Sequence, residues 1–257
     1  MKIVRTIADA SSLVTRDGTV GLVPTMGGFH EGHLALFRAA REENDRVVAS
    51  LFVNPAQFAA DEDLATYPRD KERDARLAEE AGVDVLFIPA PDELYPPDFQ
   101  TWVEVEGLGR RLEGEQRPGH FRGVATVCLK LFNIVRPDRA YFGQKDAQQV
   151  AVIRQMIRDL ALDVDLRVLP TVRDGDGLAL SSRNALLTTE ERKRALALPR
   201  ALATKDLTAA RALLARSNGL DVDYVEVAEF DPPVLAGAVR VGSVRLIDNV
   251  ALEGDSK

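Results

Sequence analysis

Short apolar runs that alternate with helical segments constrain the fold of this chain more than any other feature. These runs predict buried strands over residues 20–24, 46–53, 83–89, 139–142 and 164–169, and an edge strand over 101–105. The segments between them predict helices over residues 33–44, 69–81, 121–135 and 145–160. Strands that are apolar along their length and separated by helices are typical of a parallel sheet covered on both faces. We therefore expect an α/β fold, a Rossmann-like doubly wound parallel sheet that binds ligands at the carboxyl ends of its strands.

The pattern changes near Pro170. Beyond it the sequence predicts a turn at residues 174–177, one helix that begins at 188 and a second helix over 207–216. Two antiparallel strands are predicted over residues 222–227 and 239–247. The first of these helices opens with a capping-box pairing of Thr188 and Glu191. We expect a Rossmann-like domain over residues 1–171 and a second, smaller α+β C-terminal domain over residues 172–257.

Composition excludes several classes of protein. The 257 residues are 46% apolar and 28% charged, as in ordinary globular proteins. With 33 basic and 40 acidic residues the net charge is −7, which argues against nucleic acid as the main partner. The single cysteine, Cys128, excludes an intramolecular disulfide and is predicted to be a small buried core residue. The chain shows no signal peptide and no apolar run of the roughly 20 residues that cross a bilayer, so we expect a cytoplasmic protein with no membrane partner.

A stretch around Gly27 and Gly28 places glycines and histidines where a predicted strand hands over to a helix. Glycines allow the backbone to approach a ligand closely, and the start of a helix presents unpaired N–H groups that favour an anion. His30 and His33 project from one side and can donate hydrogen bonds to phosphate oxygens. Two alternatives remain open. The pair could be half of a zinc site, or it could cap the helix without a catalytic role.

Polar residues interrupt the apolar pattern at two further places. Asn54 and Gln57, just after the second strand, are neutral amides suited to the hydroxyl or carboxylate groups of a small substrate. An ordinary Asn-Pro turn is the alternative there. Arg117, His120 and Arg122 lead into a predicted helix and could bind an acidic group, with a solvated basic loop as the alternative.

A fourth cluster has two parts. Lys145 begins a helix just after a strand and a glycine, from where it can reach a phosphate, and Asp146 can cap that helix or touch a ribose. Gln149 faces the same side as Lys145, one helical turn later. Arg183 and the two serines before it follow a turn and are suited to clamp a triphosphate. Plain surface charge is the alternative for Lys145 and Arg183.

With these stretches in place, the chain resembles the pantothenate synthetases, or pantoate–β-alanine ligases. The resemblance extends from the first strand to Asn249 and rests on five motifs in order. They are Pro-Thr-Met-Gly-Gly-Phe-His-Glu-Gly-His (24–33), Phe-Val-Asn-Pro-Ala-Gln-Phe (52–58), Arg-Pro-Gly-His-Phe-Arg-Gly (117–123), Phe-Gly-Gln-Lys-Asp (142–146) and Leu-Ser-Ser-Arg-Asn (180–184). The first is related to the His-x-Gly-His signature of class I aminoacyl-tRNA synthetases and nucleotidyltransferases. Two departures are Gln144, where many members carry Glu, and a shortened region between residues 194 and 221.

The resemblance implies an ATP-dependent condensation of (R)-pantoate with β-alanine, a step of pantothenate and coenzyme A biosynthesis. The carboxylate of pantoate attacks the α-phosphorus of ATP, which gives pantoyl adenylate and pyrophosphate. The amine of β-alanine then attacks the activated carbonyl, which gives pantothenate and AMP. The resemblance also implies Mg²⁺ with the ATP, a homodimer formed through the larger domain, and a smaller domain that closes as a lid.

Roles for residues of all five motifs follow from the resemblance. The catalytic residues would be His30, His33, Lys145 and Arg183, with His33 as the proton donor. The residues that bind pantoate and β-alanine would be Gln57, Gln149, Asn54, Arg117 and His120. The ATP-binding residues would be Met26, Gly27, Gly28, Phe29, His30, Glu31, Gly32, His33, Gly143, Gln144, Lys145, Asp146, Val172, Leu180, Ser181, Ser182 and Arg183. These charges fit the reaction, because two anions must be held together while the charge of the departing pyrophosphate is neutralised.

Two rival functions remain open. One is a nucleotide-binding regulatory or scaffold protein that kept the fold and lost the activity, against which the intact Lys145 and Ser-Ser-Arg motif argue. The other is a nucleotidyltransferase that stops at a dinucleotide-like product. Such an enzyme shares the His-x-Gly-His element but does not require the clusters around Asn54 and Arg117.

Overall fold

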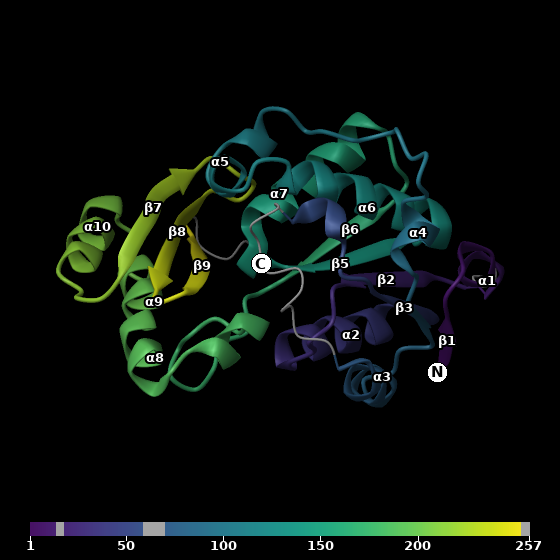
Figure 1. Cartoon of the computed structure of the whole chain (residues 1–257), viewed down its shortest axis with the longest axis horizontal. Coiled ribbons are helices and arrows are strands. Elements are labelled where there is room, and N and C mark those ends of the chain that lie inside the picture. The colour runs from purple at the N-terminus through teal and green to yellow at the C-terminus, as the bar shows by residue number, and fades with distance from the viewer. Residues whose placement is uncertain (14–17, 59–69, 253–257) are drawn as a thin grey trace. The chain divides into compact units, whose positions relative to one another are not determined.

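The computed structural model describes residues 1–13, 18–58 and 70–252. The chain divides into two compact units, whose elements are labelled in Figure 1. The first unit comprises Met1–Phe142 and Gln149–Leu169, and the second comprises Gly143–Gln148 and the chain from Pro170 onward. The short segment Gly143–Gln148 therefore groups with the second unit, although it directly follows a strand of the first. The expected domain boundary after residue 171 stays a prediction.

The first unit is built on a parallel six-stranded sheet in the order β1-β4-β3-β2-β5-β6. Its strands are β1 Lys2–Val4, β2 Val20–Thr25, β3 Arg46–Leu51, β4 Val85–Phe87, β5 Arg139–Gly143 and β6 Asp165–Leu169. The central strand β2 pairs in parallel with β3 on one side and with β5 on the other. The direction in which the sheet is built reverses between β2 and β5, and open α/β sheets bind ligands at such a point. The expected Rossmann-like fold is confirmed.

Neighbouring residues of β2 belong to different hydrophobic clusters, because side chains of a strand alternate between the two faces of a sheet. Leu22 packs in one cluster with side chains of α6 and α7, and Val23 packs in another with side chains of α2 and α3. Figure 1 shows these helix pairs on opposite faces of the sheet. The helices of this unit are α1 Ile7–Leu13, α2 Glu31–Glu43, α3 Lys71–Glu80, α4 Pro91–Leu94, α5 Glu113–Gln116, α6 His120–Val135 and α7 Ala147–Asp159, with the 3₁₀ helices η1 Pro55–Gln57 and η2 Leu108–Arg110. The first two residues of α7 group with the second unit.

The second unit is built on a three-stranded antiparallel sheet in the order β7-β8-β9. Its elements are the strands β7 Asp221–Ala228, β8 Val234–Val241 and β9 Val244–Ala251, the helices α8 Thr189–Ala195, α9 Ala197–Leu202 and α10 Leu207–Ala215, and the 3₁₀ helices η3 Gln144–Asp146 and η4 Ser182–Leu186. A hydrophobic cluster that includes Leu198, Leu214 and Leu235 joins the helices to the sheet. The capping box of Thr188 and Glu191 is present, as predicted.

The strand predicted over residues 239–247 is wrong, because it runs across a hairpin. β8 ends at Val241 and β9 begins at Val244, and Gly242 adopts a φ of +59° in the tight turn between them. A Gly-Ser pair between two β-branched runs is a hairpin signal in its own right. The predicted pair of strands is therefore a meander of three.

Three other predictions differ in extent. Residues 101–105 form no strand, and the N–H of Val103 donates to Oγ1 of Thr126 at 3.0 Å. The helix predicted from residue 145 begins as η3 and becomes α7 only at residue 147, and the helix predicted from residue 33 begins two residues earlier. Of the helix predicted over 69–81, residue 69 lies outside the described residues.

Candidate active site

The turn that follows β2 is held in shape by a buried carboxylate from α3. Gly27 and Gly28 adopt φ values of +93° and +67°, a region that other residues disfavour. The N–H groups of Gly28 and Phe29 then both donate to Asp74, at 2.8 Å to Oδ2 and 2.8 Å to Oδ1. Asp74 is only 1% exposed. Asp74 therefore occupies two main-chain donors of the turn.

Two histidines cap the start of α2 with the same ring atom. His30 is the N-cap residue, and its Nδ1 accepts from the N–H of Gly32 at 3.2 Å. Nδ1 of His33 accepts from the N–H of His30 at 3.3 Å, and the two half-buried rings lie 4.2 Å apart between centroids. Because a backbone N–H can only donate, each Nδ1 is unprotonated and each neutral ring carries its proton on Nε2. The capping alternative therefore describes the geometry correctly, and the caps themselves orient an Nε2–H donor in each ring.

The second and third motifs meet in one polar cluster of the first unit. Asn54 and Gln57 are 1% and 7% exposed, and Nδ2 of Asn54 donates to Oε1 of Gln57 at 3.1 Å. Nδ1 of His120 lies 2.8 Å from the main-chain oxygen of Gln57, and Nη1 of Arg117 lies 3.1 Å from Nε2 of His120. Since arginine only donates, Nε2 of His120 accepts and Nδ1 donates. His120 thus holds the backbone of Gln57 in place.

This polar cluster also reaches the first motif. Nε2 of Gln57 donates to Sδ of Met26 at 3.0 Å. The cluster depends on Gly123 in α6, because a Cβ at that position would lie 2.2 Å from the main-chain oxygen of Ala56. Only glycine lets α6 approach η1 this closely. Residues of three motifs that are far apart in the sequence are therefore side by side in the first unit.

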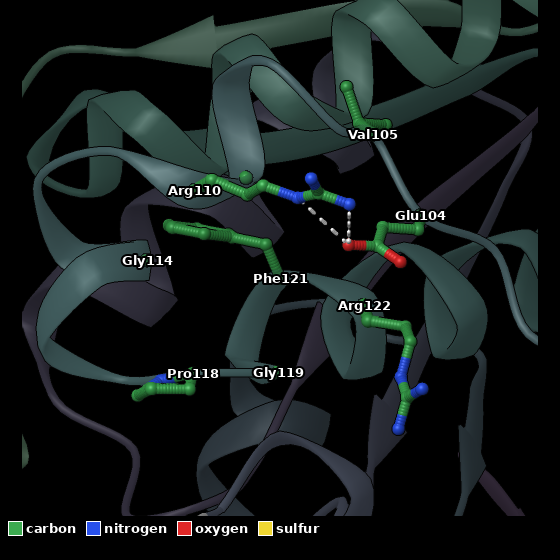
Figure 2. A pocket seen from close by; sticks show the side chains of 9 residues that line it. Glu104, Val105, Arg110, Gly114, Pro118, Gly119, Phe121 and Arg122 are labelled. Carbon is green, nitrogen blue, oxygen red and sulfur yellow. Dashed lines mark hydrogen bonds and ion pairs between the residues drawn. The ribbon is translucent and has the colours of Figure 1, made fainter.

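The guanidinium of Arg122 lies over the aromatic ring of Trp102, 4.8 Å from its centre. Arg122 lines a separate hollow of about 250 Å³, shown in Figure 2, together with Glu104 and Arg110. Nε and Nη2 of Arg110 donate to Oε1 of Glu104 at 3.4 and 3.3 Å, the dashed lines of Figure 2. Both arginines of this hollow are engaged within the chain.

In the second unit, the backbone around Lys145 is fastened to β9. The half-buried Lys145 places its Nζ 3.3 Å from Oδ1 of Asp146. Nδ2 of Asn249 donates to the main-chain oxygens of Gln144 and Lys145, at 2.9 Å each. Gln149, expected to face the same side as Lys145, is half-buried on α7 and belongs to the first unit.

The Ser-Ser-Arg stretch leaves a short hairpin of the second unit. The N–H of Leu180 donates to the main-chain oxygen of Val172 at 2.9 Å, next to a bridge between Arg173 and Ala179. The side chain of Ser181 then caps η4 by accepting from the N–H of Arg183 at 3.3 Å. Ser181, Ser182 and Arg183 are all half-buried. The local fold thus fixes the backbone of the motif while its side chains keep access to solvent.

Two other candidate sites carry no chemistry in the structure. The described residues contain no group of three or more His, Cys, Asp or Glu side chains that could hold a metal ion, so nothing in them supports the zinc alternative. Cys128 is 3% exposed within α6, and burial raises the pKa of its thiol to about 12. It is a protonated core residue at neutral pH, as predicted.

The sequence of this chain matches a known protein family over almost its whole length. The sequence model of the pantoate–β-alanine ligases matches residues 2–251. The chain belongs to the pantoate–β-alanine ligase family. It is 51% identical to the pantothenate synthetase of Moorella thermoacetica, over 98% of this chain and 99% of the relative. It is 54% identical to the pantothenate synthetase of Heliobacterium modesticaldum, over 93% of each.

Solved structures agree with this family assignment. The crystal structure of pantothenate synthetase from Thermus thermophilus superposes with a TM-score of 0.95 at 46% identity, over 99% of this chain and 100% of that one. The pantoate–β-alanine ligase of Francisella tularensis, complexed with beta-gamma ATP and β-alanine, superposes with a TM-score of 0.86 at 34% identity, over the full length of both chains.

Three residues that hold the backbone near the motifs of this pantoate–β-alanine ligase family member were not predicted from its sequence. Asp74 was missed because it is one of several acidic residues in a polar helix, and only the fold reveals that it faces the turn after β2. Asp248 and Asn249 did carry a signal, since they are consecutive polar residues in a strand that is otherwise apolar apart from Arg245. Buried polar residues in a strand require partners, and that requirement could have marked them.

Proposed function

We propose that the chain catalyses the ATP-dependent condensation of (R)-pantoate with β-alanine to give pantothenate, AMP and pyrophosphate. The observation that carries this proposal is the family match over residues 2–251. The Francisella tularensis relative, which is similar over its whole length, was solved with beta-gamma ATP and β-alanine bound. The reaction makes the chain an AMP-forming carbon–nitrogen ligase of pantothenate and coenzyme A biosynthesis.

In the first step, an oxygen of the pantoate carboxylate attacks the α-phosphorus of ATP, and the bond from that phosphorus to pyrophosphate breaks. The negative charge that develops on the departing pyrophosphate is neutralised by His30, His33, Lys145 and Arg183. Nε2–H donors of the two histidines suit this role, because their Nδ1 atoms already accept from the backbone. A donor fixed in advance stabilises a transition state without reorganising during the reaction. His33 is the proposed proton donor to the leaving group.

In the second step, the amine of β-alanine attacks the acyl carbon of pantoyl adenylate, and AMP leaves. Gln57, Gln149 and Asn54 are the proposed contacts to pantoate, with Gln57 also meeting β-alanine. Arg117 and His120 support the site through the bonds that hold the backbone of Gln57. Exclusion of water protects the adenylate until the amine arrives, and closure of a lid is one means to achieve it.

ATP enters this reaction as its Mg²⁺ complex, with the metal on the triphosphate. Mg²⁺ keeps several of its waters and binds substrate phosphates more readily than cages made only of protein. The proposed contacts to the nucleotide are the residues from Met26 to His33, Gly143 to Asp146, Val172 and Leu180 to Arg183. The metal is part of the substrate in this proposal and has no ligand assigned on the chain.

The proposal also includes a homodimer formed through the larger domain, over residues 1–171, and a location in the cytoplasm. The support for both is the resemblance to the family. Among the described helices, none is at once long and apolar enough to cross a membrane.

The decisive experiment mixes the protein with ATP, pantoate and β-alanine and measures AMP. We expect AMP formation that requires both pantoate and β-alanine, and a large loss in a His33→Ala control. AMP no higher than in that control would instead support a scaffold protein without activity. Pyrophosphate release that does not depend on pantoate would support a nucleotidyltransferase.

A further inference from the structure

Two consecutive polar side chains are buried in β9. Asp248 and Asn249 are 3% and 5% exposed, in a strand whose sequence is Val-Arg-Leu-Ile-Asp-Asn-Val-Ala. Buried polar groups cost free energy unless they are hydrogen bonded. Both of these side chains are hydrogen bonded, and their partners belong to two segments that are distant from β9 in the sequence.

The Asn249 amide encloses the backbone around Lys145. Its Nδ2 donates to the main-chain oxygens of Gln144 and Lys145, and its Oδ1 accepts from Nε2 of Gln144 at 3.2 Å. A carboxylate of the same shape could not donate to either carbonyl. The position therefore requires an amide, which indicates that Asn249 sets the path of η3.

The Asp248 carboxylate holds the hairpin that leads into the Ser-Ser-Arg stretch. Nη1 and Nη2 of Arg173 donate to its two oxygens at 2.7 and 3.0 Å, a fork that fixes direction as well as distance. Nη1 of Arg173 also donates to the main-chain oxygen of Gly177 at 3.1 Å. The N–H of Asn249 donates to Oδ1 of Asp248 at 2.8 Å, so the Asp248 carboxylate is also held by the backbone of β9.

Successive side chains of a strand point to opposite faces. Asp248 and Asn249 can therefore hold one segment on each side of β9, at a separation set by the strand itself. We propose that Asp248 and Asn249 are positioning residues that hold Lys145 and Arg183 at a fixed spacing for the triphosphate. This inference rests on the proposed function, because contact of Lys145 and Arg183 with ATP is itself proposed.

The test for Asn249 is Asn249→Asp, assayed by pantoate-dependent exchange of pyrophosphate into ATP. A misplacement of about 1 Å can cost about 100-fold in rate, so we expect kcat/KM for ATP to fall about 10- to 100-fold. The KM for pantoate should stay the same, because its proposed contacts lie in the first unit. The matched control is Val250→Ala, one residue along the strand and packed against the hydrophobic cluster of the second unit. It should lower the melting temperature without lowering kcat/KM for ATP.

A double-mutant cycle separates positioning from a general loss of structure. If Asn249 acts through Lys145, the double variant Lys145→Ala/Asn249→Asp should be no worse than Lys145→Ala alone. Independent effects that multiply would overturn the inference. For Asp248 the corresponding cycle pairs Asp248→Asn with Arg183→Ala. If Asp248→Asn does not fold, Arg173→Lys takes its place, because it keeps the charge and loses the fork.

The outcomes also distinguish this inference from the proposed function. If Lys145→Ala leaves pyrophosphate exchange intact, the proposed role of Lys145 is wrong and the positioning role fails with it. If Lys145→Ala strongly lowers exchange while Asn249→Asp keeps the wild-type kcat/KM for ATP, only the positioning inference is wrong. A kcat/KM for ATP that falls equally in Val250→Ala would also overturn it.

Discussion

All three histidines of the chain are fixed in a defined tautomer by their backbone contacts. Nδ1 of His30 and of His33 accepts from an N–H, whereas Nδ1 of His120 faces a carbonyl oxygen and donates. The first two rings therefore present an N–H on Nε2 while neutral. Protonation of Nδ1 would break a cap of α2 in each case. The helix start thus selects the form of the histidine that can donate to a phosphate without first gaining a charge.

At the same scale, Lys145→Ala should cripple adenylate formation, with a low rate that can still be measured, and leave the fold intact. Lys145 is half-buried and its side chain belongs to none of the three hydrophobic clusters. The loss should therefore appear in pyrophosphate exchange and not in the far-UV circular dichroism or the melting temperature. Unchanged turnover would count decisively against a role for Lys145.

Asp74→Asn should weaken both stability and activity. The amide would turn an N–H donor toward the N–H of Gly28 or Phe29, and a buried donor left without an acceptor costs about 1–3 kcal/mol. Urea unfolding measures the loss of stability, and pyrophosphate exchange measures the displacement of the turn. Glu72→Gln, an exposed carboxylate of the same helix, is the matched control. Equal effects of the two variants would show that the hydrogen bonds from the turn to Asp74 are unimportant.

Among the elements, the contact between α6 and η1 depends on a single missing side chain. Gly123→Ala would place a Cβ 2.2 Å from the main-chain oxygen of Ala56, so α6 must move away from η1. We expect a destabilisation of about 1–3 kcal/mol from overpacking, together with a higher KM for pantoate as the support of Gln57 is lost. Gly107→Ala is the control, because nothing lies within 4 Å of a Cβ there. A variant at residue 123 that behaves like the control would refute the packing argument.

The turn before the Ser-Ser-Arg stretch should make the second unit sensitive to acid. Arg192 donates to Asp176 through Nε at 2.8 Å and Nη2 at 3.1 Å, and this bonding chiefly holds the pKa of Asp176 below its ordinary value of 3.8. A carboxylate with a lowered pKa stabilises the fold above its ordinary pKa, and this contribution is lost as the pH falls through the lower, folded value. Asp176→Asn should therefore reduce the melting temperature at pH 7.

The same comparison at acid pH provides the check. The difference in melting temperature between wild type and Asp176→Asn should shrink once the pH falls below 3.8. A difference in melting temperature that stays constant as the pH falls well below 3.8 would show that the ion pair contributes nothing through its charge.

The elements that sequence could predict are those whose pattern is local and repeated. β2, β3 and α6 appear within two residues of their expected bounds, because apolar runs and helical periodicity are properties of the segment itself. The β8–β9 hairpin was missed because two adjoining strands with the same composition look like one. The site shows the same division. Its motifs were visible in the sequence, whereas Asp74 and its contacts to the turn depend on packing between elements.

For the whole molecule, we expect a homodimer in solution. Light scattering at micromolar concentration should give a particle of about twice 28.1 kDa. The expectation comes from the family to which the chain belongs. A mass of 28.1 kDa that persists as the concentration rises would contradict it.

This chain is shorter than the alignment that it forms with a relative of its family. The alignment to the Moorella thermoacetica protein extends over 280 positions, whereas this chain has 257 residues. That relative therefore carries residues that this chain lacks. Whether the deletion lies between residues 194 and 221 stays a prediction, and the five sequence motifs all lie outside that region.

The anchoring of two segments by β9 has a consequence for the order in which the protein is made. β9 is the last element of the described chain, and Asn249 is synthesised long after the Gln144 and Lys145 carbonyls that it holds. A nascent chain on the ribosome can complete the sheet of the first unit while η3 still lacks this anchor. By the proposed positioning role, the competence to bind a nucleotide would then arrive only after β9 has left the ribosome.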